Sequence, residues 1–140
     1  MTYLAQLLSA QAARQPSAPA LTASGRPDMD YACLLTHVRR VVAALNARGI
    51  GPGDRVAIVL PNGPEMASAF LGVAAGATSA PLNPGYRESE FDFYLEDLKP
   101  KALLVKKGEN GPACEVAARR DTSYWRNRAW FCSAIGKDAC

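Results

Sequence analysis

The sequence predicts an α/β fold, a partial three-layer arrangement in which a parallel sheet carries helices on both faces. Three observations support this prediction. Apolar runs of strand length alternate with amphipathic helical segments. The connections between them are only a few residues long. The run "RVAIVL" at 55–60 is almost continuously apolar, which is typical of a strand buried on both faces of a parallel sheet.

The N-terminal third is expected to contain two helices and a short strand. Apolar residues recur at helical spacing over residues 3–14, and two prolines follow that segment. Residues 19–24 then indicate a short strand, which ends in the turn "GRPD". Asp30 is predicted to cap a helix over 31–48, because its side chain can accept a bond from an unpaired first-turn N–H. Gly49 is expected to end that helix in a left-handed conformation.

The remaining elements complete a β-α-β-α-β order, which favours right-handed crossovers. Strand 55–60 precedes a helix over 63–75, for which Asn62 is the predicted cap and Pro64 lies in the first turn. The elements expected next are a strand at 77–82, a helix at 87–98, a strand at 101–106 and a helix that begins at residue 112.

Two turns of the chain invite comparison with phosphate-binding loops. "LPNGPEM" follows strand 55–60 at the carboxyl end of a parallel strand, where ligands often bind. Glu65 favours a plain helix start instead, because a carboxylate complements the helix dipole and repels phosphate. "GIGPGD" at 49–54 lacks the third glycine of a dinucleotide fingerprint and leads from helix to strand, the reverse of the required order. Neither turn therefore predicts a phosphate site.

Composition and isolated polar residues exclude several function classes. The chain is 49% hydrophobic and 21% charged, as in ordinary globular proteins, and no apolar run approaches the ~18 residues of a membrane helix. The N-terminus lacks a basic leader, so a cytoplasmic location is expected. The four cysteines do not have zinc-site spacing. His37 has no evident orienting partner for catalysis, and the acidic residues of helix 87–98 are expected to form a solvated face.

A longer stretch resembles the N-terminal region of the adenylate-forming acyl-CoA synthetases. The similar features are Gly49 and Ile50 after a helix, Pro-Gly-Asp-Arg-Val at 52–56, Leu-Pro-Asn at 60–62, and Gly-Ala followed by Pro-Leu-Asn-Pro at 76–84. "DMDYACLLTHVRRVVAAL" is similar to the helix that precedes them. The likeness covers residues 2–120, and "FDFYLEDLKPKALLV" is most similar to the branch of oxalate–CoA ligases and related short- or medium-chain acyl-CoA ligases.

The resemblance implies a reaction in which a carboxylic acid, ATP and Mg²⁺ give an acyl-adenylate, which coenzyme A then converts to a thioester. It also implies that these 140 residues are the start of a large N-terminal domain. The family's Ser/Thr/Gly-rich phosphate loop ending in Pro-Lys, its nucleotide motifs and its catalytic lysine are absent from this sequence. We therefore predict no catalytic, cofactor-binding or metal-binding residue, and no cofactor bound by this fragment.

The function predicted on this basis is that of a truncated ATP-dependent acid–CoA ligase, inactive alone. The alternative is a non-catalytic α/β binding or regulatory module that pairs with a full-length paralogue. The partners that the resemblance implies are a carboxylic acid, ATP and CoA, without nucleic acid and without a membrane span. Self-association is expected, because the sheet of the resembled fold continues into strands that this chain lacks. The peroxisome is the alternative location for full-length members, although no peroxisomal address is present here.

The last residues differ in composition from the rest, which divides the chain at 1–120 and 121–140. The net charge is +4 over residues 101–140 and −1 over residues 1–100. Trp125 and Trp130, the two tryptophans, also lie in this end segment. Its composition and lack of strand alternation are typical of translation in a shifted frame or an alternative exon; a divergent natural end is the other interpretation. The segment is expected to pack loosely and to contribute little stability.

Overall fold

The strands predicted from the central apolar runs form one parallel sheet. The computed structural model describes residues 3–106, 108–120 and 122–126. The strand order is β4-β3-β5-β6, and every neighbouring pair is parallel, with Val56 aligned to both Ser79 and Ala102. The strands are β3 (Arg55–Val59), β4 (Thr78–Pro81), β5 (Ala102–Val105) and β6 (Ser123–Arg126). The prediction of a parallel sheet with 55–60 as an inner strand is confirmed.

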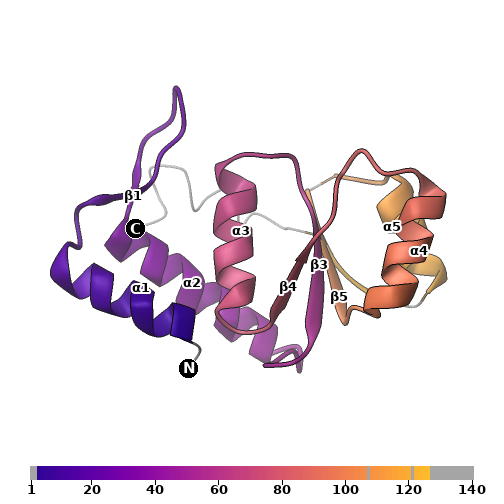
Figure 1. Ribbon diagram of the computed structural model, residues 1–140, viewed down its shortest axis with the longest axis horizontal. Helices are drawn as coiled ribbons and strands as arrows, with labels where there is room; N and C mark the ends of the chain where they lie inside the picture. Colours follow the sequence, from indigo (N-terminus) through magenta and orange to yellow (C-terminus); the bar gives the residue numbers. More distant parts are fainter. Residues whose placement is uncertain (1–2, 107, 121, 127–140) are drawn as a thin grey trace.

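Helices cover both faces of this sheet, as predicted. Figure 1 shows α2 and α3 on one side of the strands and α4 and α5 on the other. The helices are α1 (Tyr3–Arg14), α2 (Tyr31–Asn46), α3 (Pro64–Ala74), α4 (Glu88–Leu98) and α5 (Pro112–Arg119). None of the helices within the described segments is long and apolar enough to cross a membrane.

Alternation along each inner strand builds two separate cores. Val56 and Ile58 of β3 pack on one face with residues of α2 and α3, together with Ala102 and Leu104 of β5. The intervening residues of both strands pack on the other face with α4 and α5; they are Ala57, Val59, Leu103 and Val105. All eight strand residues are buried. Because successive side chains point to opposite faces, a continuously apolar strand is the only pattern that supplies both cores.

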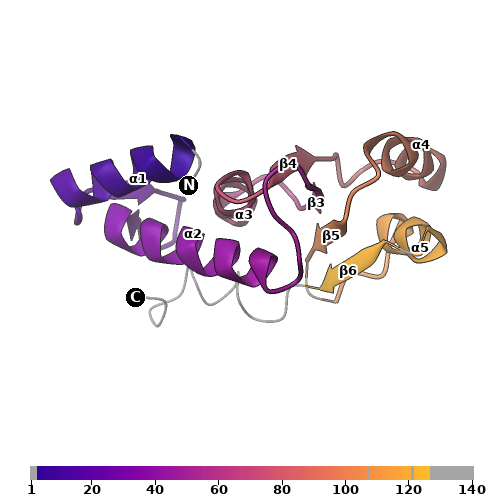
Figure 2. The ribbon, with the colours of Figure 1, turned by 90° about the horizontal axis from the view of Figure 1, so that it is seen from below.

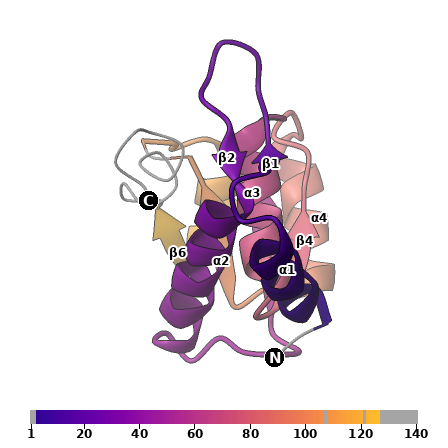
Figure 3. The same ribbon diagram turned by 90° about the vertical axis from the view of Figure 1, so that its left-hand side faces the viewer.

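The N-terminal elements add a third apolar cluster beside α2. A short antiparallel pair, β1 (Pro19–Leu21) and β2 (Met29–Asp30), connects α1 to α2. Met29 is buried with Leu34 and Val38 of α2, and Leu8 of α1 packs against them. Figure 3 shows the loop between β1 and β2 projecting beyond the helices. The sequence predicted the first strand but not β2, because two residues are too few to show a periodicity.

Part of the C-terminal segment, which was expected to pack loosely, is a strand of the sheet. Residues 123–126 form β6, which pairs in parallel with β5 at the edge of the sheet (Figure 2). These four residues thus form a strand although their sequence lacks strand alternation, and the expectation of loose packing does not hold for their backbone. The pairing also argues against the expectation that residues 121–140 contribute little stability, because β5 would become an edge strand without β6. The expectations for residues 127–140 lie outside the described residues.

Candidate functional site

The carboxyl edge of the sheet is the part of the fold where a ligand site is expected. The chain leaves β3 through α3 to β4 on one side, then crosses back over β3 to reach β5 on the other side. Open parallel sheets with this reversal bind ligands outside the carboxyl ends of their strands. The segments at this edge include Leu60 and Asn62 after β3, Leu82 and Asn83 after β4, and Lys106 after β5.

The prediction that the Asn62 side chain caps α3 is wrong. The N-cap residue is Gly63, at φ 156°, and no side chain caps the helix by a hydrogen bond. The Asn62 side chain lies one residue too early in the chain for that role and is exposed. Pro64 does occupy the first helical turn, as predicted. By contrast, the prediction for α2 is confirmed, because the Cys33 N–H donates to the Asp30 side chain at 2.8 Å.

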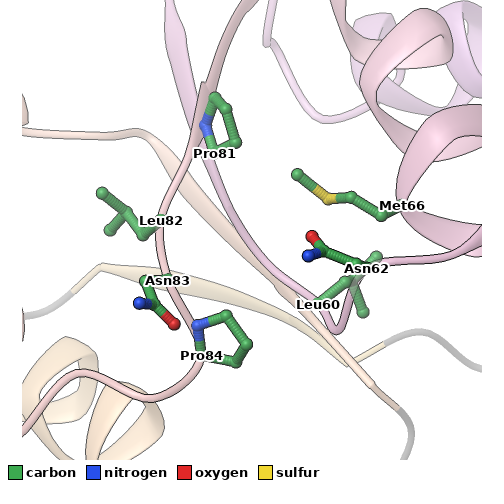
Figure 4. Close-up of a pocket in the computed structure, with 7 residues that line it drawn as sticks. All are labelled: Leu60, Asn62, Met66, Pro81, Leu82, Asn83 and Pro84. Atoms are coloured by element: carbon green, nitrogen blue, oxygen red, sulfur yellow. The ribbon is translucent and has the colours of Figure 1, made fainter.

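A cleft of about 410 Å³ lies between the ends of β3 and β4. Its lining consists of Leu60, Asn62, Met66, Pro81, Leu82, Asn83 and Pro84. Figure 4 shows Asn62 and Met66 reaching from the α3 side toward the Pro81–Pro84 segment. Ligand pockets are commonly ~300–1,000 Å³, mostly apolar, with few polar groups. The cleft falls within this range of volume, and its polar side chains are two carboxamides.

The side chains of Asn62 and Asn83 differ in their hydrogen bonds. The Asn83 side chain accepts a hydrogen bond from the Gly85 N–H at 2.8 Å, and the Asn83 carbonyl accepts one from the Tyr86 N–H at 3.2 Å. Asn83 therefore holds its own turn. The Asn62 carboxamide makes no hydrogen bond within the described residues. The sequence indicates the turn at Asn62 but does not determine which of the two amides remains available.

An ion pair lies beside the cleft at this edge, with Lys106 close enough to influence it. Glu65, in the first turn of α3, accepts a hydrogen bond from Arg26 of the β1–β2 loop. The Arg26 hydrogen bond holds the pKa of Glu65 below its usual value, although burial opposes the shift and the nearby Lys106 adds a smaller lowering effect. The carboxylate thus stays ionised and paired, consistent with the expectation that this helix start does not favour phosphate. The pair joins residues 39 positions apart, which sequence reasoning could not foresee.

The other polar residues considered from the sequence lie away from this edge. His37 is buried in α2, where burial lowers its pKa while a hydrogen bond with the Ser68 backbone opposes the shift. The acidic face of α4 is not simply solvated: Glu88 pairs with Arg119, and Asp92 and Glu96 pair with Arg120. Lys106, which the sequence placed at the end of a strand over 101–106, follows the last residue of β5, whereas Lys107 lies outside the described residues.

A second cleft, of about 340 Å³, lies at the opposite, amino edge of the sheet. Three basic residues line it, namely Lys99, Lys101 and Arg120. Lys101 donates to the side chain of Asp54 and to the Gly49 carbonyl, each at 3.0 Å, and Arg120 is paired with two carboxylates of α4. Two of the three cations are therefore already neutralised. Within the described segments, no cluster of three or more His, Cys, Asp or Glu residues is arranged to hold a metal ion.

This fold defines the chain as part of an α/β domain of the doubly wound type, a class of domain whose ligands commonly bind at the carboxyl edge of the sheet. The family model of the AMP-binding enzymes matches residues 8–128, so the chain belongs to that family. The match extends eight residues beyond position 120 and includes β6.

The curated relatives are mostly much longer than this chain. The oxalate–CoA ligase of Arabidopsis thaliana is 41% identical over 123 residues, which cover 86% of this chain and 24% of the relative. The oxalate–CoA ligase of Saccharomyces cerevisiae is 57% identical over 56 residues, 39% of this chain and 10% of the relative. The chain thus spans about a quarter or less of each of these enzymes. The resemblance to adenylate-forming acyl-CoA synthetases is confirmed.

Solved structures of CoA ligases share the same fold. A long-chain-fatty-acid CoA ligase of Rhodopseudomonas palustris superposes with a TM-score of 0.79 over 97% of this chain and 37% of its own, at 23% identity. The N-terminal domain of FACL13 from Mycobacterium tuberculosis superposes with a TM-score of 0.74 over 98% of this chain and 36% of its own, at 27% identity. The predicted α/β fold of an N-terminal acyl-CoA synthetase domain is therefore confirmed.

Proposed function

We propose that these 140 residues supply the first part of the large domain of an ATP-dependent acid–CoA ligase and do not form an acyl-adenylate by themselves. The observation that carries the proposal is the chemistry of the carboxyl-edge cleft. Its lining contains no Lys, Arg, Asp or Glu side chain. Acyl-adenylate formation places developing charge on phosphate groups, and such charge requires fixed cations or hydrogen-bond donors aimed at it.

The single Pro-Lys pair of the sequence supports the same proposal. It occurs at Pro100–Lys101, after a segment that is not rich in Ser, Thr or Gly. It precedes β5 at the amino edge of the sheet, opposite the cleft, where Lys101 is paired with Asp54. The lysine of this Pro-Lys pair therefore lies at the edge of the sheet opposite the one where a phosphate-binding loop is expected. In this view the chain contributes scaffold and part of a substrate cleft, while ATP, Mg²⁺ and coenzyme A are bound by groups beyond these residues.

Pyrophosphate release tests the proposal. The purified chain is incubated with ATP, Mg²⁺ and oxalate, butyrate or octanoate, and the Arabidopsis oxalate–CoA ligase serves as the positive control. We expect no release above the protein-free background from this chain. Saturable release that depends on its concentration would contradict the proposal. A cytoplasmic location and self-association remain predictions; the exposed rings of Phe70 (40%) and Phe93 (67%) support the latter.

A further inference from the structure

We propose that the tip of the β1–β2 loop is a strap, held against the start of α3 by the Arg26–Glu65 ion pair, and that it opens while the rest of the chain stays folded. The strap is independent of the proposed function, because its opening requires neither nucleotide nor acid. The loop covers residues 22–28 and extends past the ends of the helices (Figure 3). Its base and its tip are held by different contacts.

The base of the loop is anchored in the fold. Met29 is 4% exposed and packs against α2. The Tyr31 N–H donates to the Ala18 carbonyl at 3.1 Å, which fixes the chain on the far side of β2. β1 and β2 share only two aligned residue pairs, with an irregular register between them, so the ladder gives little rigidity toward the tip. The loop is therefore expected to hinge between Leu21 and Met29.

The tip is held to the rest of the fold by one polar contact. Arg26 donates a hydrogen bond to the Glu65 carboxylate in the first turn of α3. Among the residues that the structure describes, no other hydrogen bond or ion pair joins residues 22–28 to another element. Five of the seven loop residues are exposed, and only Ala23 and Arg26 are partly buried. Loss of the ion pair is therefore expected to release the tip.

The backbone of the tip keeps its shape without help from α3. The Arg26 N–H donates to the Ala23 carbonyl at 3.1 Å, and Gly25 has the left-handed φ of 71° that this turn requires. Pro27 restricts the backbone of Arg26 from the other side. The tip therefore moves as a unit, and little backbone entropy is lost when Arg26 meets Glu65.

The ion pair is weak enough to open. The side chains of Arg26 and Glu65 are 35% and 33% exposed, and such pairs are screened by salt and contribute little free energy. Opening also leaves Glu65 with some compensation. The Arg26 hydrogen bond is the main cause of its lowered pKa and burial opposes the shift, but the charge of Lys106 acts in the same direction as Arg26.

NMR relaxation of the ¹⁵N- and methyl-labelled chain at pH 7 tests the strap. At low salt we expect the order parameter S² of the Gly25 amide to be about 0.85, as in rigid backbone. In Arg26→Gln, in Glu65→Gln and in the wild type at 1 M NaCl, we expect it to fall below about 0.6. The methyl signal of Met29 should stay unchanged in all of them, because the base of the loop remains anchored.

Two further variants separate the strap from general effects of charge. Glu88→Gln is the matched control, because it removes a carboxylate that pairs with Arg119 on the other face of the sheet; it should leave the Gly25 amide rigid. The double variant Arg26→Gln/Glu65→Gln should be no more flexible than either single variant. The proposal is overturned if Gly25 is already flexible in the wild type at low salt, if either single variant keeps the wild-type order parameter, if the control or the double variant departs from these expectations, or if the Met29 signal changes together with that of Gly25.

Discussion

The two faces of the sheet are held by different means, although each buries an apolar core of similar composition. On the α2–α3 face, the helices approach closely at glycines: a Cβ at Gly72 would lie 2.9 Å from Cγ2 of Val41, and one at Gly76 would lie 3.0 Å from Cγ2 of Val42. On the α4–α5 face, carboxylates along α4 pair with Arg119 of α5 and with Arg120, the residue that follows this helix. The packing of α2 on α3 therefore depends on close steric fit, whereas the packing of α4 on α5 also includes ion pairs.

This difference shows how much each kind of contact can contribute. Close packing in a dry interface has no room for an added atom, so even a methyl group must displace its neighbours. Ion pairs at a half-exposed interface are screened by water and salt and contribute little. We therefore expect the α2–α3 face to be sensitive to volume and the α4–α5 face to be sensitive to ionic strength.

The largest expected effect is that of Gly72→Ala. The added methyl would overlap Val41, which is buried between α2 and α3, and overpacking of this kind costs about 1–3 kcal/mol. Urea denaturation measures the loss in the free energy of unfolding. Gly51→Ala is the control, because a Cβ there meets no atom within 4 Å and the backbone is not left-handed. Equal stabilities of the two variants would show that α2 and α3 move apart without cost.

An intermediate effect on the free energy of unfolding is expected when the pH is lowered. It arises from His37 of α2, on the same face of the sheet as α3. His37 is buried, and its folded-state pKa lies below the usual 6.5, so the unfolded chain binds the proton more readily. Stability should be complete above about pH 6.5 and should fall as the pH decreases toward the folded-state pKa. The measurement is the urea midpoint at pH 7.5 and pH 5.5.

His37→Gln tests the assignment of this pH dependence. The variant has no group that titrates in this window at position 37, so the decrease between pH 7.5 and 5.5 should become smaller, whatever its absolute stability. The carboxyl groups of Glu65 and Asp54 do not interfere, because both have lowered pKa values and titrate at more acidic pH. An unchanged slope in the variant would assign the dependence to other groups.

The smallest effect is expected from Arg120→Gln on the α4–α5 face. The guanidinium bridges Asp92 and Glu96 of α4, but the Glu96 side chain is 62% exposed. We expect a loss of about 0.2–1 kcal/mol at low salt, which disappears at 1 M NaCl as the wild type loses the same contribution. Gly72→Ala should keep its full cost at high salt. A salt-independent loss in Arg120→Gln would indicate packing by the arginine stem instead.

Local sequence determined most of the fold. The continuous apolar run of β3 specified a strand buried on both faces, and Asp30 and Pro64 marked the starts of α2 and α3. These features depend on residues within a few positions of one another. The apolar periodicity and the capping residues of each element can therefore be read from the sequence. The family resemblance was equally available, because its motifs are contiguous.

Tertiary structure decided the features that depend on distant partners. The cleft joins segments that follow β3 and β4, and the Arg26–Glu65 pair joins the β1–β2 loop to α3. The four residues of β6 show no alternation of their own, and pairing with the buried strand β5 makes them a strand. At Asn62 a one-residue difference in helix start decided between a cap and a side chain that faces the cleft. The sequence determines the local preference for helix or strand. Packing fixes the residue at which each helix begins and decides which residues distant in the sequence come into contact.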